Sequence, residues 1–176
     1  MQYDLIVVGG GIGGSALASV MAKDGWNVLV LEKQAEYIDR VRGEWIAPWG
    51  VAEVQSVGLY DLLMAAGGHH ITSHVTYDEN LDPELCESVA QPLGILPDVP
   101  GPLCIGHPHH CETLFNEAES QGATCLRPVT VEQVTLGDAP SVTYEHLGEK
   151  HVVTAPLIVG AEGRQSLVRG AAGIAL

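Results

Sequence analysis

A glycine-rich segment near the N-terminus, Gly9 to Gly14, is the feature that most constrains the fold. It reads Gly-Gly-Gly-Ile-Gly-Gly and satisfies the spacing G-x-G-x-x-G. An apolar run, Tyr3 to Val8, precedes it, apolar residues at helical spacing follow it, and a second apolar run occupies Asn27 to Leu31. This order predicts two parallel strands joined by a right-handed helical crossover, the beginning of a Rossmann-like α/β domain.

The glycine spacing has a physical reason in dinucleotide binding. Gly9 permits a tight turn, Gly11 lets the backbone approach a pyrophosphate, and Gly14 lets the helix pack closely on the strand. The N-terminus of the helix offers N–H groups and a partial positive charge to the phosphates. Glu32 ends the second apolar run, where a carboxylate can bind the ribose hydroxyls of adenosine and disfavours a 2′-phosphate. These residues suit NAD and FAD equally.

The middle of the chain has a less regular pattern. Two short helices are expected between Gly50 and Ala66, and an alternating strand over 71–77. Residues 79–108 hold six of the ten prolines, so an extended and irregular connection is expected there. A helix is predicted over 111–121.

The last third predicts a β-meander and a return to the central sheet. Three short strands are expected over 129–136, 141–146 and 152–154, and a buried strand over 157–159 runs into a helix from Ser166. The expected fold class is therefore α/β, a Rossmann-like FAD- or NAD(P)-binding domain with a parallel central sheet and an antiparallel β-meander.

Composition excludes several functions. The 176 residues include 8 Lys and Arg against 22 Asp and Glu, a net charge of −14, which argues against nucleic acid and anionic membrane surfaces as partners. The longest uncharged run, Leu5 to Ala22, contains five glycines and is predicted to be neither a membrane span nor a signal peptide. The four cysteines form no C-x-x-C pair and are interpreted as reduced thiols of a cytoplasmic protein.

Two later segments resemble a known family. Leu157 to Arg169 resembles the second fingerprint of the FAD-dependent aromatic hydroxylases (group A flavoprotein monooxygenases), in which an apolar strand leads into G-A-D-G-x-x-S-x-x-R. Arg42 to Gly50 resembles that family's R-x-G-x-x-L-x-P-x-G segment, and the G-L helix follows at Ser56 to Leu63. The resemblance, which covers nearly the whole chain, implies FAD as cofactor, NADH or NADPH as transient reductant, and a small aromatic or polycyclic substrate.

The resemblance also implies cofactor-binding residues, and no catalytic side chain, because the flavin carries the oxygen chemistry. Arg42 would contact the FAD pyrophosphate or ribitol, and Glu162 would replace a family aspartate, or else cap the helix that follows it. His107 replaces a family arginine, so flavin binding could be weaker or pH-dependent. The expected cofactor-binding residues are Gly9, Gly11, Ile12, Gly13, Gly14, Glu32, Lys33, Arg42, His107, Glu162 and Gly163.

A metal site is not expected. His107, His109, His110 and Cys111 are bunched within five residues, so they cannot easily surround one ion. The pair His69-His70 is likewise interpreted as a loop pair rather than a ligand site.

The length suggests an incomplete enzyme. The third fingerprint of the resembled family, a G-D-A stretch, lies well after the second, whereas here only 13 residues follow Gly163. The G-D-A at 137–139 lies between two meander strands and is interpreted as a hairpin turn. We therefore expect residues 1–176 to be an incomplete FAD-binding domain, inactive alone, with 68–108 as an excursion toward a mostly missing substrate domain. Its partners would be that missing portion or a second copy of the chain.

Three alternatives remain open. The chain could be a non-catalytic dinucleotide-binding module. It could be related to flavin-dependent halogenases or prenyl reductases, because Gly43-Glu44 followed by Pro48 is similar to their G-E-x-x-x-P segment, although no lysine lies between 60 and 110 where tryptophan-type halogenases have one. A simple NAD dehydrogenase would explain neither the Arg42 segment nor the turn at Glu162.

Overall fold

A parallel four-strand sheet, in the order β12-β1-β2-β8, lies within one of the two compact units of the chain. The computed structural model describes residues 2–39 and 44–175. β1 (Leu5–Val8) and β2 (Val28–Leu31) lie in the middle and are buried over their whole length. β8 (Thr124–Leu126) and β12 (Leu157–Gly160) form the edges. The continuous apolar runs of β1 and β2 are explained by burial on both faces of the sheet.

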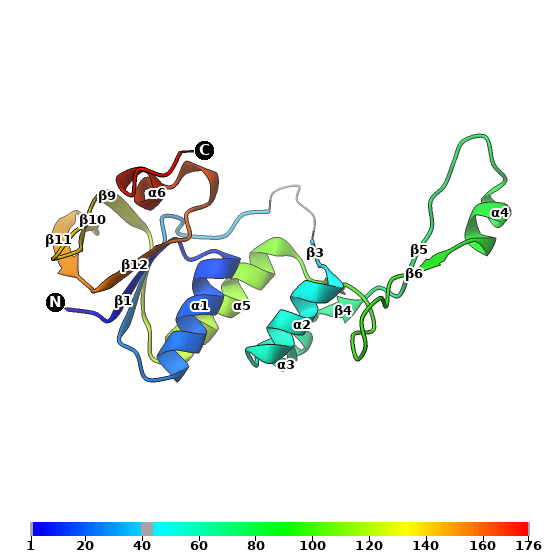
Figure 1. The fold of residues 1–176 in the computed structure, drawn as a ribbon, viewed down its shortest axis with the longest axis horizontal. Coiled ribbons are helices and arrows are strands. Elements are labelled where there is room, and N and C mark those ends of the chain that lie inside the picture. The colour runs from blue at the N-terminus through cyan, green and yellow to red at the C-terminus, as the bar shows by residue number, and fades with distance from the viewer. Residues whose placement is uncertain (1, 40–43, 176) are drawn as a thin grey trace. The chain divides into compact units, whose positions relative to one another are not determined.

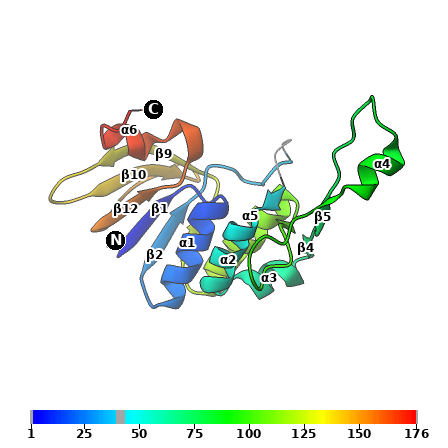
Figure 2. The same cartoon turned by 45° about the vertical axis from the view of Figure 1, so that its right-hand side comes forward.

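Each face of this sheet has its own apolar core. On one face, α1 (Ile12–Lys23) and α5 (His107–Ser120) pack against the alternating residues Leu5 and Val7 through Ala18 and Phe115. On the other, Ile6 and Val8 contact the β-meander and α6 (Leu167–Ala171). Figures 1 and 2 show the resulting helix, sheet and meander layers. The predicted α/β class with a parallel sheet and a meander is confirmed.

The meander consists of β9 (Val129–Thr135), β10 (Ser141–His146) and β11 (Glu149–Thr154), in the order β11-β10-β9. β11 begins three residues before the predicted strand. The reason is a two-residue turn in which both Leu147 (φ 52°) and Gly148 (φ 83°) have positive φ, so pairing resumes at once. The G-D-A segment lies in the connection between β9 and β10, as expected.

Residues 40–109 form a second compact unit, while 1–39 and 110–176 form the first. The described part of the second unit holds three helices and five short strands, which pair in the orders β3-β7-β4 and β5-β6. They are α2 (Pro48–Ser56), α3 (Tyr60–Ala65), α4 (Pro83–Ser88), β3 (Trp45–Ile46), β4 (His69–His70), β5 (Ser73–His74), β6 (Gln91–Pro92) and β7 (Leu103–Cys104).

Three element predictions need correction. The single strand over 71–77 is wrong, because β4 and β5 are separate two-residue strands. β4 pairs with β7, which follows Pro102, and β5 pairs with β6, which contains Pro92. Neither proline has an N–H group that could extend the ladder of hydrogen bonds. α5 begins four residues earlier than predicted, since Pro108 lies in its first turn, where a missing N–H costs nothing. β8 was not predicted; its three residues are too few to show a pattern.

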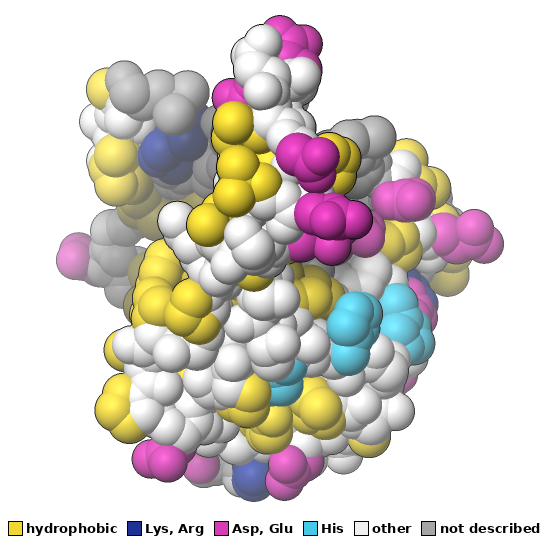
Figure 3. All heavy atoms as spheres, turned by 90° about the vertical axis from the view of Figure 1, so that its right-hand side faces the viewer, with side chains coloured by type: hydrophobic (Ala, Val, Ile, Leu, Met, Phe, Trp, Pro, Cys, Tyr) yellow, Lys and Arg dark blue, Asp and Glu magenta, His cyan; other side chains and the backbone are white. Residues whose placement is uncertain are grey.

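The surface reflects the acidic composition. Figure 3 shows acidic side chains at several places on one face, between separate groups of hydrophobic side chains. Within residues 2–39 and 44–175, no helix is long and apolar enough to cross a bilayer.

Candidate functional site

The glycine segment forms a turn at the carboxyl edge of the parallel sheet, between β1 and α1. Gly9 has φ 101°, and a Cβ built on it would lie 2.5 Å from the carbonyl oxygen of Ala161, just after β12. A Cβ on Gly14 would lie 1.9 Å from the carbonyl oxygen of Gly9. These two glycines are therefore required by the fold itself.

Gly11 and Gly13 differ from these two. Apart from the chain neighbours and the backbone of α1 itself, no heavy atom lies within 4 Å of the position that a Cβ would take at either residue. Gly11 is the N-cap of α1, whose first N–H groups have no acceptor within the helix. The backbone is thus open on the side where the motif predicts a pyrophosphate. Ile12, the first helical residue, is 37% exposed.

Glu32 lies directly after β2 and is only 5% exposed. Its Oε2 accepts a hydrogen bond from the N–H of Gly10 at 2.7 Å, and its Oε1 accepts one from the N–H of Gln34 at 2.8 Å. Each carboxylate oxygen can accept a further bond, so these contacts leave capacity for ribose hydroxyls. The neighbouring Lys33 is exposed.

Gly10 is a structural requirement that the sequence motif does not predict, since it fills an unspecified position of G-x-G-x-x-G. A Cβ there would lie 2.9 Å from Cβ of Glu32 and 2.9 Å from Cε2 of Phe115. The carbonyl oxygen of Gly10 accepts hydrogen bonds from Oγ of Ser15, at 2.6 Å, and from the hydroxyl of Tyr37. The peptide groups on both sides of Gly10 are therefore anchored.

Tyr37 belongs to a cluster that sequence reasoning missed. Its ring meets the ring of Phe115 edge to face at 6.2 Å, and the guanidinium of Arg127 lies 5.4 Å and 4.7 Å from these two ring centroids. Arg127 forms a two-pronged ion pair with Glu112, with distances of 2.6 and 2.8 Å. The cluster joins three distant segments, which no local pattern reveals. Burial, and then the charge of Glu32, raise the pKa of Tyr37 well above its usual value, while the Arg127 hydrogen bonds lower the pKa of Glu112.

Glu162 makes the contacts of a helix cap. Its carboxylate accepts hydrogen bonds from Oγ of Ser166 at 2.5 Å, from the N–H of Leu167 at 2.9 Å and from the N–H of Val168 at 3.3 Å. These bonds satisfy N–H groups at the start of α6. Gly163, with φ 77°, begins a 3₁₀ turn over Gly163–Gln165, and the position that a Cβ would take there is open apart from the chain neighbours. A role of either residue toward a cofactor stays a prediction.

Two further residues were predicted to bind the cofactor. Arg42 lies outside the described residues, and His107 lies in the second unit. His107 begins α5, and its N–H donates to Oε1 of Glu44 at 3.2 Å. Nearby, Nε2 of His109 bonds to the carbonyl oxygen of Ala66 at 2.7 Å, and His110 is buried. In the part of the chain that the structure describes, no group of three or more His, Cys, Asp or Glu side chains is arranged to hold a metal ion.

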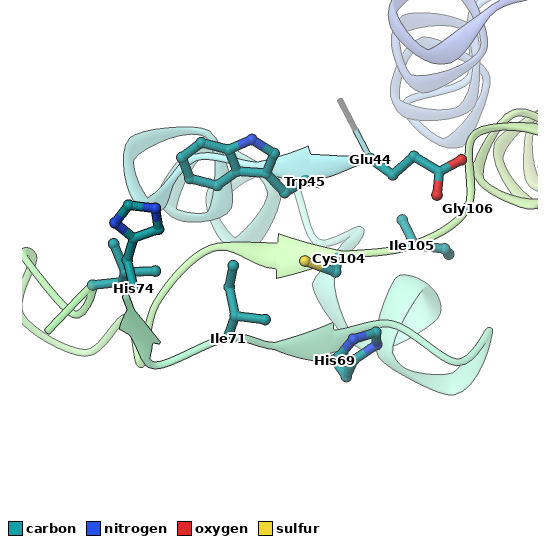
Figure 4. Close-up of a pocket in the computed structure, with 9 residues that line it drawn as sticks. Glu44, Trp45, His69, Ile71, His74, Cys104, Ile105 and Gly106 are labelled. Carbon is teal, nitrogen blue, oxygen red and sulfur yellow. The ribbon is translucent and has the colours of Figure 1, made fainter. Parts of the chain in front are cut away.

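The second unit contains a pocket of about 740 Å³ beside β3, β7 and β4. His74 lies at one end and Glu44 at the other, with Ile71 and Cys104 between them (Figure 4). Burial, with a contribution from Glu44, raises the pKa of the Cys104 thiol. Trp45, which is half exposed, adds an aromatic surface. Together with Ile71, Leu93 and Ile105 it makes the lining mainly apolar.

Comparison with known proteins places this geometry in a family. Residues 2–176 match the family described as FAD binding domain. The chain belongs to this family of FAD-binding domains. Curated relatives of this FAD-binding domain include squalene monooxygenase of Mus musculus, 29% identical over 94% of this chain and 29% of the relative. Squalene epoxidase 5 of Arabidopsis thaliana is 31% identical over 94% of this chain and 32% of the relative.

Solved structures agree with this assignment. CabE, an aromatic hydroxylase from angucycline biosynthesis, is 28% identical to the FAD-binding domain with a TM-score of 0.75, over 98% of this chain and 33% of CabE. OxyS anhydrotetracycline hydroxylase from Streptomyces rimosus has a TM-score of 0.79 at 23% identity, over 98% of this chain and 34% of its own, and supports the fold alone. The predicted resemblance to FAD-dependent aromatic hydroxylases is confirmed. The chain spans about a third of the length of these relatives.

Proposed function

We propose that this FAD-binding domain serves a flavoprotein monooxygenase that takes electrons from NADH or NADPH. The observation that carries the proposal is the pairing of open backbone at Gly11 and Gly13 with a buried carboxylate, Glu32, at the same edge of the sheet. The phosphates of a dinucleotide need open backbone N–H groups, and its ribose hydroxyls need a carboxylate acceptor. Because the glycine turn and Glu32 suit several dinucleotides, membership in the family of FAD-binding domains is what favours FAD among them.

The residues of this chain would bind and orient the cofactor rather than perform the chemistry. The turn at Gly11 and Gly13, at the positive end of α1, would hold the pyrophosphate, and Glu32 would hold the adenosine ribose. As the family resemblance implies, Arg42 would contact the FAD pyrophosphate or ribitol, and His107 would donate to a phosphate or a ribityl hydroxyl. When bound, FAD supplies the redox chemistry that transfers oxygen to the substrate.

An apolar substrate suits the pocket in the second unit. A volume of about 740 Å³ lies in the ordinary range for small-molecule sites, and Trp45 and Ile71 favour a ring or hydrocarbon over a charged metabolite. We propose an aromatic or polycyclic substrate that becomes hydroxylated. The curated relatives named squalene monooxygenase and squalene epoxidase favour a second candidate, epoxidation of a long alkene.

The setting of the chain is part of the same proposal. We propose that residues 68–108 lead toward a substrate domain, that a further portion of the protein completes the active site, and that the protein works in the cytoplasm.

Cofactor identity tests the proposal against its rivals. The purified chain should be yellow, and the cofactor released by heat should co-elute with FAD in chromatography. Oxidation of NADH and NADPH, with aromatic compounds or squalene present, then reports the reductant and the substrate class in a protein carrying the whole active site. A colourless preparation that binds NAD but not FAD would instead support a dehydrogenase, and a chain that binds only ADP would support a non-catalytic module.

A further inference from the structure

We propose that Tyr37 and Ser15 are positioning residues that aim the N–H of Gly11 at the cofactor pyrophosphate. The inference rests on the proposed FAD-binding function and adds two side chains that no sequence motif assigns. Its basis is the carbonyl oxygen of Gly10, which accepts hydrogen bonds from both hydroxyl groups.

The geometry of a single peptide unit links these contacts to the ligand. The carbonyl of Gly10 and the N–H of Gly11 belong to the same planar trans peptide, so they point in opposite directions. Ser15 and Tyr37 fix the carbonyl on the protein side. The N–H of Gly11 must then point the other way, away from Ser15 and Tyr37. A Cβ built on the same residue would meet no heavy atom within 4 Å apart from its chain neighbours, so the backbone of Gly11 is open to a ligand.

Glycine makes this control necessary. Three consecutive glycines, Gly9 to Gly11, leave the backbone with more conformational freedom than any other residues would. On the other side of Gly10, its N–H is held by Glu32 at 2.7 Å. With the carbonyl held as well, the peptide that must face the phosphates is fixed before the ligand binds, which reduces the ordering cost of binding.

Tyr37 is itself held in place and remains a donor. Its ring packs edge to face on Phe115 and lies beside Arg127, which Glu112 anchors through two hydrogen bonds. Burial keeps the pKa of Tyr37 far above neutral pH, so its hydroxyl stays protonated. Ser15 is fully buried, and its Oγ lies 2.6 Å from the carbonyl oxygen of Gly10.

The test compares two ligands that differ only in the pyrophosphate. Isothermal titration of the full chain with ADP and with adenosine is carried out for the parent, Tyr37→Phe, Ser15→Ala and the double variant. Tyr60→Phe is the matched control, because Tyr60 is also half-buried and its hydroxyl lies 3.0 Å from Nε2 of His70 in the second unit. Thermal unfolding of each variant reports the fold.

We expect each single variant to bind ADP about 5- to 10-fold more weakly, with adenosine affinity unchanged and ADP affinity of Tyr60→Phe equal to the parent. Equal loss for ADP and adenosine would reveal a merely structural role and overturn the inference. Unchanged ADP affinity in both single variants and the double variant would overturn it too, with the FAD-binding proposal intact. A parent chain that binds neither ADP nor FAD would overturn both.

Discussion

The backbone N–H of Gly10 donates a hydrogen bond to Oε2 of Glu32 at 2.7 Å, and this bond ties the glycine turn after β1 to the end of β2. The residue expected to hold the ribose therefore also holds in place the turn that is expected to bind the pyrophosphate. Some substitutions at this site should therefore weaken ligand binding, others should lower the free energy of unfolding, and the contacts of each residue predict which effect is larger.

The glycines of the turn should separate into two classes. Gly11→Val should retain the fold, at a cost of up to about 1 kcal/mol for a poorer helix cap. It should nevertheless weaken FAD and ADP binding by about a hundredfold, roughly 3 kcal/mol, because its side chain fills the open space. Gly14→Ala should instead destabilise the chain by about 3 kcal/mol, since its Cβ would lie 1.9 Å from the oxygen of Gly9. Urea unfolding and ADP titration measure both effects; parental ADP affinity in Gly11→Val would contradict the assignment.

Glu32→Ala should lose both binding and stability. Binding of ADP should weaken by about 1–3 kcal/mol through the lost bonds to the ribose, and the free energy of unfolding should fall by a similar amount because Gly10 and Gln34 lose their acceptor. Glu32→Gln, which keeps one carbonyl acceptor, should lose less of each. If Glu32→Ala bound ADP as tightly as the parent, Glu32 would not belong to the adenosine site.

Glu162 should contribute to stability as a helix cap. Glu162→Ala removes the acceptor of three hydrogen bonds at the start of α6 and should lower the free energy of unfolding by about 1–2 kcal/mol. Glu149→Ala, an exposed glutamate at the start of β11, is the control and should change it by less than about 0.5 kcal/mol. Equal stability of the two variants would show that the cap contributes nothing.

The Glu112–Arg127 pair should make stability depend on acidic pH. Arg127 lowers the pKa of Glu112 in the folded state, so the pair stabilises the fold above the unfolded value near 4.5 and ceases to do so as pH falls through the lower, folded value. The pair is partly exposed, so its contribution should be at most about 1 kcal/mol. The urea-unfolding free energies of the parent and Glu112→Gln should differ at about pH 7, and the difference should shrink as the pH falls below about 4.5. A constant difference across this range would assign the effect to packing.

The sequence predicted those parts of the site that depend on local pattern. The turn from Gly9 to Gly14 and the position of Glu32 follow from a spacing that backbone geometry imposes. The hydrogen bond from Tyr37 to Gly10 and the close approach of Phe115 to Gly10 could not be predicted, because both residues come from segments far from the turn in the chain. For Glu162 the alternatives of cofactor contact and helix cap remained open, since a carboxylate after a strand suits either, and only its bonds to residues 166–168 show the cap.

The strands differ in the same way, because some follow from a local sequence pattern and others depend on a distant partner. β1 and β2 are apolar throughout because both of their faces are covered, and such runs are visible in a sequence. β8, β4 and β5 have two or three residues each, and they are strands only because a partner lies beside them.

Binding of FAD by the full chain tests the proposed function most directly. Flavin fluorescence is followed while FAD is titrated with the parent chain and, as the matched control, with folded Gly11→Val. We expect saturable binding of one FAD per parent chain, tighter than the binding of NAD, and loss of that binding in Gly11→Val. A folded parent chain that leaves FAD unbound, or that binds NAD more tightly than FAD, would contradict it.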